Sequence, residues 1–319
     1  MIHVKIIIAI HHLNLASKTT VKFVEQVIIS NDKKILDKLF ENKSIKEVIG
    51  LNEIQSLYDH GTFLYIETFL DINEDNFNER NYLISQLLLI EMLCQSFWLV
   101  KDNSIKTELG HLIYSSEKRL RIHSNLWTSS YTNCLGISEK TIFSEEEIKS
   151  AMIFFPSIVQ SLSADKNFNP SIKLTSKTNR LGRGLYFLQS ARSQVDIGTK
   201  LSHYCSVLES LFSVSNAELK HRLSETIALF LSDTKVDRLK IYKTIQSAYD
   251  IRSAIVHGDS IPEKFLRNDY ILLKETVEFT DTYIRKCFSK ILNSQKLTIL
   301  FTAEQKEKVI EFIQNLIFE

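Results

Sequence analysis

The sequence predicts a mainly helical protein in which an N-terminal α+β domain is followed by a C-terminal helical bundle. Glycine and proline are scarce, with 8 and 3 copies in 319 residues, and this scarcity favours long helices over tight turns. Runs rich in β-branched and aromatic residues occur in the first 75 residues, whereas apolar residues at helical spacing dominate after about residue 180. A chain of this length has room for two hydrophobic cores.

The N-terminal domain is expected to span residues 1–165. Its strand-like runs are VKIIIAI, KFVEQVIIS and TFLYIETFL, and KKILDKLFEN has a helical pattern. Residues 80–96 are expected to form a helix, and FWLVKDNSI a strand directly after it. Ser144 and Glu147 form a capping-box pattern at the start of another helix, which Pro156 is expected to end or kink.

A basic segment separates the two domains. Residues 166–182 are expected to be a linker, because the chain from Lys166 to Val195 carries several basic residues and no acidic one. The helical domain is expected at 183–295, followed by a C-terminal helix within 296–319. Apolar periodicity predicts helices over residues 183–213, 218–232, 236–257, 266–293 and 303–317.

Composition and charge exclude several classes of protein. The net charge of +1 provides no overall field that would attract a nucleic acid or a membrane, so any basic binding site must be local. The most apolar stretch, YLISQLLLIEMLCQSFWLV, is interrupted by Gln86, Glu91 and Gln95, which indicates a core helix and not a membrane span. The four cysteines are scattered without metal-ligand spacing, as is typical of thiols in a reducing cytosol. We therefore expect a cytoplasmic protein with no cofactor, no metal and no membrane partner.

The stretch YDIRSAIVHGDS places an arginine among apolar residues near the end of a predicted helix. Arg252 shares the apolar face of that helix, and burial of a guanidinium without an anionic partner is costly. Glu209, at the edge of the apolar stripe in KLSHYCSVLESLF, is the expected partner if the two helices pack antiparallel. Such a pair would hold the guanidinium in a fixed pose with donors to spare.

His257 follows Arg252 by five positions, which in a regular helix is about 140° around the axis and about 7.5 Å along it. Gly258 is expected to end the helix in the left-handed conformation. A helix C-terminus favours positive charge, and histidine is suited to both accepting and donating protons near neutral pH. The alternatives are an Arg–Glu pair that only stabilises the bundle and a histidine that only caps the helix.

Residues 180–293 resemble HEPN domains, specifically those of the Apea-like branch. The matching stretches are RGLYFLQSARSQVDIGTKLSHYCSVLESLF, LKHRLSETIALFL and IYKTIQSAYDIRSAIVHG. Arg252 and His257 match the signature of the family, an arginine and a histidine with a short spacer, and Glu209 matches the acidic residue of the second long helix. The resemblance implies a HEPN-like helical bundle that forms a homodimer through the C-terminal domain, and it implies a metal-independent endoribonuclease.

The resemblance also implies roles for individual residues. Arg252 and His257 would be catalytic, and the residues expected to support them are Glu209, Ser253, Asp250 and Tyr249. The candidate contacts for an RNA partner are Lys173, Lys177, Arg180, Arg183, His221 and Arg222. RNA can be cut by its own 2′-hydroxyl group, which requires proton transfer and a cation beside the phosphorane but no metal.

The biological context implied by the resemblance is bacterial phage defence or a toxin–antitoxin pair, with an antitoxin or another defence component as a protein partner. Ser253 keeps an alternative open, because many active members of the family carry Asn, Asp or His directly after the arginine. That alternative is a catalytically silent scaffold that binds RNA, a nucleotide or a protein. For the basic segment, the alternative to RNA contact is a plain linker.

Overall fold

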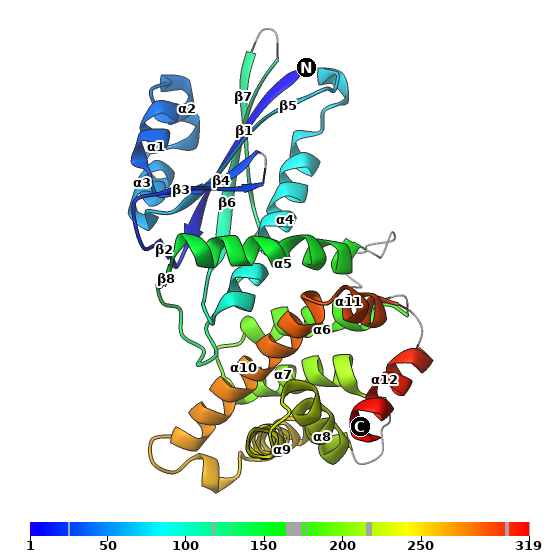
Figure 1. The fold of residues 1–319 in the computed structure, drawn as a ribbon. Helices are drawn as coiled ribbons and strands as arrows, with labels where there is room; N and C mark the ends of the chain where they lie inside the picture. The colour runs from blue at the N-terminus through cyan, green and yellow to red at the C-terminus, as the bar shows by residue number, and fades with distance from the viewer. Residues whose placement is uncertain are drawn as a thin grey trace. The chain divides into compact units, whose positions relative to one another are not determined.

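The computed structural model of the protein consists of two compact units (Figure 1). It describes residues 1–24, 26–116, 119–127, 129–163, 174–176, 178–214, 219–303 and 306–318. The sheet unit comprises Met1–Phe97, Asn103–Ser130 and Ser138–Phe155, and the helical unit comprises Trp98–Asp102, Tyr131–Ile137 and Pro156–Glu319. The protein is therefore mainly α with an α+β N-terminal part, as predicted.

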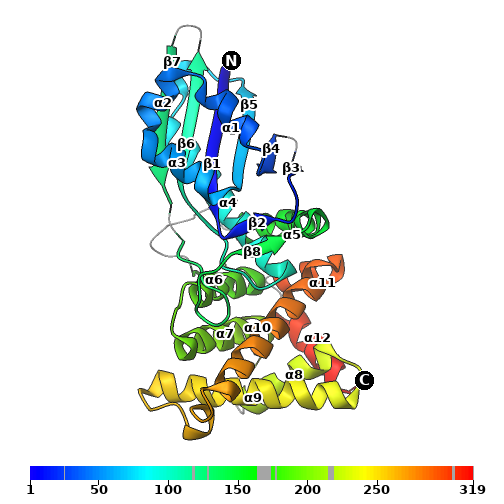
Figure 2. The same cartoon turned by 90° about the vertical axis from the view of Figure 1, so that its left-hand side faces the viewer.

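A six-stranded antiparallel sheet forms the core of the sheet unit (Figure 2). Its strands, in spatial order, are β3 (Thr20–Val24), β4 (Val27–Ser30), β5 (Phe63–Leu70), β1 (Ile2–His11), β6 (Lys106–Ser116) and β7 (Arg119–Leu126). β1 is central, and its Ile6 pairs with Ile66 of β5 and with Leu112 of β6. Ile6 to Ile10 are all buried, which explains why this strand is continuously apolar and does not alternate. A separate parallel pair joins β2 (Leu13–Leu15) to β8 (Thr141–Phe143).

Three short helices pack on one face of the sheet. They are α1 (Lys33–Phe40), α2 (Lys43–Ile49) and α3 (Leu51–His60). Their buried side chains form one cluster with Ile7, Ala9, Phe63 and Ile113, which point to the same face of the sheet because side chains alternate along a strand. Only α1 is predicted from the sequence, by the pattern KKILDKLFEN.

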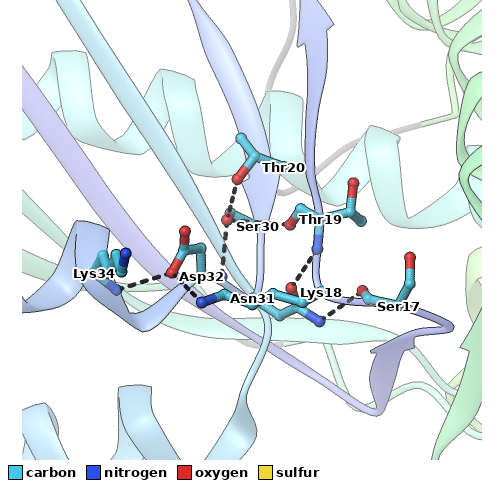
Figure 3. Close-up of polar contacts among 8 residues, drawn as sticks. All are labelled: Ser17, Lys18, Thr19, Thr20, Ser30, Asn31, Asp32 and Lys34. Carbon is cyan, nitrogen blue, oxygen red and sulfur yellow. Dashed lines mark hydrogen bonds and ion pairs between the residues drawn. The ribbon is translucent and has the colours of Figure 1, made fainter.

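A polar network fixes the connection between β2 and β3 against the start of α1 (Figure 3). Asn31 is central to it: Oδ1 accepts the Thr19 backbone N–H at 2.9 Å, and Nδ2 donates to the Ser17 carbonyl at 3.0 Å. Asp32 caps α1 and lies 3.1 Å from Lys18 Nζ. The hydrogen bond from Lys18 is the largest cause that lowers the pKa of Asp32. The carboxylate therefore remains ionised and keeps the chain fixed where it leaves β4.

α4 (Glu79–Val100) packs on the opposite face of the sheet. Leu87 approaches Gly110 of β6 so closely that an added Cβ would lie 2.9 Å from Leu87 Cδ2. Within the described part of the chain, α4 is the one helix long and apolar enough to cross a membrane, yet 56% of its most apolar window is buried. This burial is that of a core helix. The strand expected in FWLVKDNSI is wrong, because Phe97 and Trp98 are buried within α4 and continue it.

α5 (Glu145–Ser163) begins with the predicted capping box. The Ser144 N–H donates to Glu147 Oε2 at 2.9 Å, and the Glu147 N–H donates to Ser144 Oγ at 3.2 Å. Pro156 does not end this helix, which continues to Ser163. A proline within a helix removes one main-chain hydrogen bond, and burial of Ala151 before it and Ile158 after it holds both flanking turns in place.

The helical unit is built around α7, which packs against α6, α8, α9 and α10. The helices of this unit that follow α5 are α6 (Arg180–Arg192), α7 (Ile197–Phe212), α8 (Leu219–Leu231), α9 (Lys235–His257), α10 (Ile271–Leu292), α11 (Gln295–Thr302) and α12 (Lys306–Phe318). Leu201, Cys205 and Leu208 of α7 are fully buried. The predicted helices at 218–232 and 236–257 correspond to α8 and α9.

The helix predicted over 183–213 is instead two helices. α6 starts at Arg180, inside the expected linker, and ends at Arg192. Asp196 then begins α7 by accepting the Thr199 N–H at 2.7 Å. The helix predicted over 266–293 begins later than expected, because Asn268, Asp269 and Tyr270 all have left-handed backbone conformations before α10. Neither interruption contains the Gly or Pro that would mark it in the sequence.

Two short segments that precede α5 belong to the helical unit, and buried polar groups hold them there. Trp98 Nε1 donates to Asp281 Oδ1 of α10 at 3.0 Å. Thr132 Oγ1 accepts a hydrogen bond from Lys200 Nζ at 3.0 Å. The Arg192 guanidinium lies over the ring of Tyr131, 4.3 Å from its centre. The side chains of Lys200 and Arg192 are fully buried, so this part of the core is unusually polar.

Lys200 is expected to make the helical unit more stable as pH rises from about 8 towards 10.5. Burial lowers the pKa of Lys200 from 10.5 to about 8, so the unfolded chain binds this proton over a range where the folded protein does not. The contribution is complete above the unfolded pKa and is lost as pH falls through the folded pKa. A shift of this size corresponds to roughly 3 kcal/mol.

Urea unfolding followed by circular dichroism measures this dependence between pH 7.5 and 10.5. We expect the Lys200→Met variant to show a smaller gain in stability over this range than the wild type. Lys243, which is exposed on α9, provides the matched control, because Lys243→Met should keep the wild-type dependence of the free energy of unfolding on pH. The same dependence on pH in all three proteins would contradict the prediction that Lys200 causes it.

Candidate functional site

The candidate site is centred on α7 and α9, which run antiparallel. Early in α7, a Cβ added to Gly198 would lie 2.9 Å from Ile255 Cδ1, late in α9. Later in α7, Glu209 contacts Tyr249 and Arg252, which precede Ile255 in α9. The glycine permits close approach of the two helices at one end, and the polar groups meet at the other.

Glu209 binds two groups from α9. Its Oε1 accepts the Tyr249 hydroxyl at 2.8 Å and lies 3.5 Å from Arg252 Nη2. The predicted ion pair between Glu209 and Arg252 is therefore confirmed. Burial raises the pKa of Tyr249, and the nearby Cys205 and Glu209 add to the effect, so the hydroxyl remains a neutral donor. Tyr249 thus holds the carboxylate in place, and the carboxylate holds Arg252.

The Glu209–Arg252 pair is only partly buried, with 28% of the arginine side chain and 23% of the glutamate side chain exposed. The sequence places Arg252 on a buried face, but its guanidinium reaches the edge of that face. Pairs that water still reaches contribute about 0–1 kcal/mol to stability. The separation of 3.5 Å is longer than a good hydrogen bond, and a guanidinium has five N–H donors. Arg252 therefore has donors with which it can bind an anionic solute.

His257 is the last residue of α9 and is exposed. Gly258 has a φ of 75°, its N–H donates to the Ile255 carbonyl at 3.2 Å, and the Asp259 N–H donates to the Ala254 carbonyl at 2.8 Å. These two bonds form a Schellman motif, so the predicted left-handed stop at Gly258 is confirmed. The motif fixes the backbone at His257 while the imidazole is open to solvent.

Asp250 and Ser253 flank the arginine and differ in their surroundings. Asp250 Oδ1 lies 2.5 Å from Lys220 Nζ of α8, and Oδ2 lies 3.3 Å from Lys264 Nζ. Asp250 therefore links α9 to α8 and to the turn after α9, which is a structural contribution to the site. Ser253 is exposed next to Arg252, where its hydroxyl is accessible to a ligand.

Arg180 has a structural position that removes it from the candidate RNA contacts. The residue is buried, and its Nη1 donates to the carbonyls of Leu211 at 3.1 Å and Ser213 at 2.9 Å. These groups lie at the C-terminal end of α7, where helix carbonyls lack partners within the helix. Burial lowers the pKa of Arg180, yet an arginine remains charged and suits the negative end of a helix.

The other basic candidates are spread over two helices. Arg183 is half-buried and donates from Nη1 to the Thr178 carbonyl at 2.6 Å. His221 and Arg222 are exposed on α8, and His221 Nδ1 lies 3.3 Å from the Tyr242 hydroxyl. Lys173 and Lys177 lie outside the described residues. Of the four candidates that the structure describes, the two on α8 therefore have the exposure that contact with RNA requires.

Three histidines of the sheet unit lie together. The rings of His11 and His60 have centres 3.8 Å apart, and those of His11 and His12 are 6.4 Å apart. Burial, followed by the nearby His60, lowers the pKa of His11 to about 4, so its imidazole is neutral near pH 7. No sequence motif predicts that His60 lies beside His11 and His12, because His60 is the last residue of a separate element, α3. Among the described residues, no group of three or more His, Cys, Asp or Glu side chains is arranged to hold a metal ion.

Comparison with known proteins adds no assignment, since no family model, no curated protein and no solved structure matches the chain. The functional argument therefore rests on the arrangement of Glu209, Tyr249, Arg252 and His257.

Proposed function

We propose that the helical unit is a metal-independent endoribonuclease of the HEPN type that cuts single-stranded RNA. The observation that carries this proposal is Arg252, which Glu209 holds at 3.5 Å while more than a quarter of its side chain remains exposed. An oriented, accessible guanidinium can stabilise the negative charge that develops on a pentavalent phosphate. His257, exposed about 1.4 turns further along α9, can transfer protons in the same reaction.

The proposed reaction uses the RNA itself as the nucleophile. The 2′-oxygen attacks the adjacent phosphorus, its proton passes to a neutral imidazole, and the bond from phosphorus to the 5′-oxygen breaks. A protonated imidazole gives a proton to the departing 5′-oxygen. The products are a 2′,3′-cyclic phosphate and a 5′-hydroxyl, and the atoms balance without a metal or a second substrate. The two steps require histidines in opposite protonation states.

A homodimer meets the geometric needs of this reaction. Within one regular helix, Arg252 and His257 diverge by about 140°, so one protomer does not direct both side chains to the same phosphate. A two-fold axis beside α9 would give a self-complementary interface in which both copies of each residue line one groove. This assembly also supplies the two histidines that the reaction uses.

We expect the protein to sediment as a dimer at micromolar concentration and Val256→Lys to dissociate it. Val256 directly precedes His257 and is 56% exposed on α9, so a lysine there would add a cation beside both copies of Arg252 in the dimer, where like charges repel. Val236 lies near the start of the same helix and is 79% exposed, and Val236→Lys is the matched control that should remain dimeric. A wild-type monomer whose sedimentation does not change with concentration would contradict this assembly.

The activity is tested by incubating the purified protein with single-stranded RNA in EDTA and identifying the ends of the products. We expect 2′,3′-cyclic phosphate ends, and we expect toxicity on overexpression in the bacterial cytoplasm, in keeping with a role in phage defence or as a toxin with an antitoxin partner. Cleavage that needs Mg²⁺ and persists without His257 would exclude the proposed mechanism.

Ser253 favours a second candidate function, a catalytically silent scaffold. It is exposed next to Arg252, and its hydroxyl orients a substrate less strongly than the amide, carboxylate or imidazole that many active HEPN domains carry there. On this alternative, the wild type never cuts RNA, but it retains RNA, a nucleotide or a protein in a pull-down, and Arg252→Ala and His257→Ala lose that partner.

A further inference from the structure

A pocket of about 380 Å³ opens in the sheet unit, on the face of the sheet that α4 covers. It lies between β5 and α4 and is bordered by Phe23 at the end of β3 and by Phe155 of α5. The two phenylalanine rings meet edge to face with their centres 5.3 Å apart. The lining residues that the structure describes all belong to the sheet unit.

The pocket has a simple origin in the strand lengths. β4 begins at Val27, which pairs with Ile66 of β5, whereas β5 continues to Leu70. Beyond Ile66, the edge of β5 that pairs with β4 therefore has no neighbouring strand among the described residues. Thr68 and Leu70 point to the face covered by α4, because side chains alternate along a strand. They leave a hollow beneath the first turns of α4.

The lining of the pocket is apolar with a few uncharged polar groups. Most of the lining side chains that the structure describes are apolar, among them Phe23, Leu64, Ile66, Leu89 and Leu93. Tyr82 and Gln86 of α4 and Thr68 of β5 also line it, and their side chains make no hydrogen bond with another described residue. Burial raises the pKa of Tyr82, so its hydroxyl is a neutral donor and acceptor near pH 7.

We propose that this pocket binds a neutral, mainly apolar small molecule that carries one or two hydrogen-bonding groups. Small-molecule sites are typically of about 300–1,000 Å³, apolar, and supplied with a few polar groups that orient the ligand, and this pocket fits that description. None of the lining side chains that the structure describes is charged, so a carboxylate or a phosphate would enter without a described cation to balance it. The sheet unit is then a ligand-binding module, and this holds independently of the proposed ribonuclease.

The fluorophore N-phenyl-1-naphthylamine is a suitable probe, because it is neutral, apolar and has one N–H donor, and because its emission rises when it leaves water. We expect saturable binding of one probe per chain. Leu89→Trp fills the pocket and should weaken binding by at least about tenfold. Ser85→Trp adds the same side chain to an exposed position of the same helix and should bind as the wild type does. Emission without saturation, or equal binding by both variants, would overturn the proposal.

Thiol labelling tests the pocket without filling it. The four native cysteines are buried, so a cysteine introduced by Gln86→Cys should be the one that reacts rapidly with a maleimide in the folded protein. We expect the probe to slow this reaction by about tenfold at a concentration that is tenfold above its Kd, because the occupied fraction is then about nine-tenths. Ser85→Cys should react at the same rate with and without the probe. Equal rates at position 86 would place the probe elsewhere and reject the site.

Discussion

His257→Ala is expected to abolish RNA cleavage by this protein while leaving its fold intact. The imidazole is exposed and the Schellman motif around Gly258 depends on backbone groups, so alanine should be accommodated without repacking. In the proposed reaction, His257 is the group of the motif that transfers protons. Its loss removes general acid–base catalysis, which typically contributes about 10²–10⁴-fold to rate.

Arg252→Lys tests the stabilisation of the phosphate charge, since it keeps the positive charge and removes the planar guanidinium with its several N–H donors. Arginine can face Glu209 with one nitrogen and a phosphate oxygen with another, whereas an ammonium group is a single point of charge. We expect cleavage to fall by about 10²–10³-fold, the usual effect of losing one contact to a developing oxyanion. The measurement is the rate of appearance of 2′,3′-cyclic phosphate ends in EDTA.

Matched control variants distinguish the expected losses of RNA cleavage from a general loss of folding. His3→Ala removes a partly exposed imidazole from the sheet unit, where it lies 2.9 Å from Glu67, and Arg267→Lys changes an arginine that is 66% exposed and pairs with Glu263. Both should cleave at the wild-type rate. If cleavage survives in His257→Ala and in Arg252→Lys, a contaminating nuclease is responsible and the ribonuclease proposal fails. If cleavage falls equally in all four variants, the site has been placed on the wrong residues.

The centre of the candidate site could be predicted because its signals are local. Apolar residues recur at helical spacing in both α7 and α9, so the faces that pack together can be read from each helix alone. A charged residue on such a face must find a partner, which is why Arg252 and Glu209 could be paired in advance. The stop at Gly258 is local as well, since it depends on one residue that tolerates positive φ.

A charged residue on an apolar face also occurs in α10, where it is Asp281. The sequence indicates that Asp281 needs partners, but it does not identify them. Asp281 shares a face with Val277, Ile284 and Phe288, all buried. Its partners Tyr204 and Trp98 precede it by 77 and 183 residues, and no periodic pattern connects segments so far apart. The sequence does not predict strands β6 and β7 for a related reason, because strands are stabilised by pairing with distant segments. Arg180 shows the converse, a basic residue whose capping role depends on the tertiary fold.

Asp281→Ala is expected to destabilise the helical unit by about 3–5 kcal/mol, which is the usual effect of removing one partner from a buried ion pair. Asp281 is 1% exposed, and its Oδ2 forms an ion pair with Arg285, whose side chain is 14% exposed. Its Oδ1 accepts Trp98 Nε1 at 3.0 Å and the Tyr204 hydroxyl at 2.7 Å. Alanine would leave a cation and two buried donors without their acceptor.

Asp281→Asn separates the hydrogen bonds from the charge, since an amide oxygen still accepts from Trp98 and Tyr204. Burial raises the pKa of Asp281 from 3.8 to about 6, with Arg285 acting in the opposite direction. A raised pKa means that this group contributes most to stability below its unfolded pKa, and the contribution is lost as pH rises through the folded pKa. The deficit of the asparagine variant should therefore be larger at pH 4.5 than at pH 7.5.

Hydrogen–deuterium exchange suits this test, because it reports the protection of each helix and strand separately in a chain with two compact units. Amides of α7 and α10 should exchange faster in Asp281→Ala, and amides of β1 and β5 serve as an internal reference. Asp233→Ala alters a carboxylate that is fully exposed beside Arg238, and it should leave exchange in both helices unchanged. If α7 and α10 keep wild-type protection in Asp281→Ala, the buried network does not hold the helical unit together. Its polar groups would then reduce stability at that site, because apolar residues of similar volume would fill the space without the cost of desolvation.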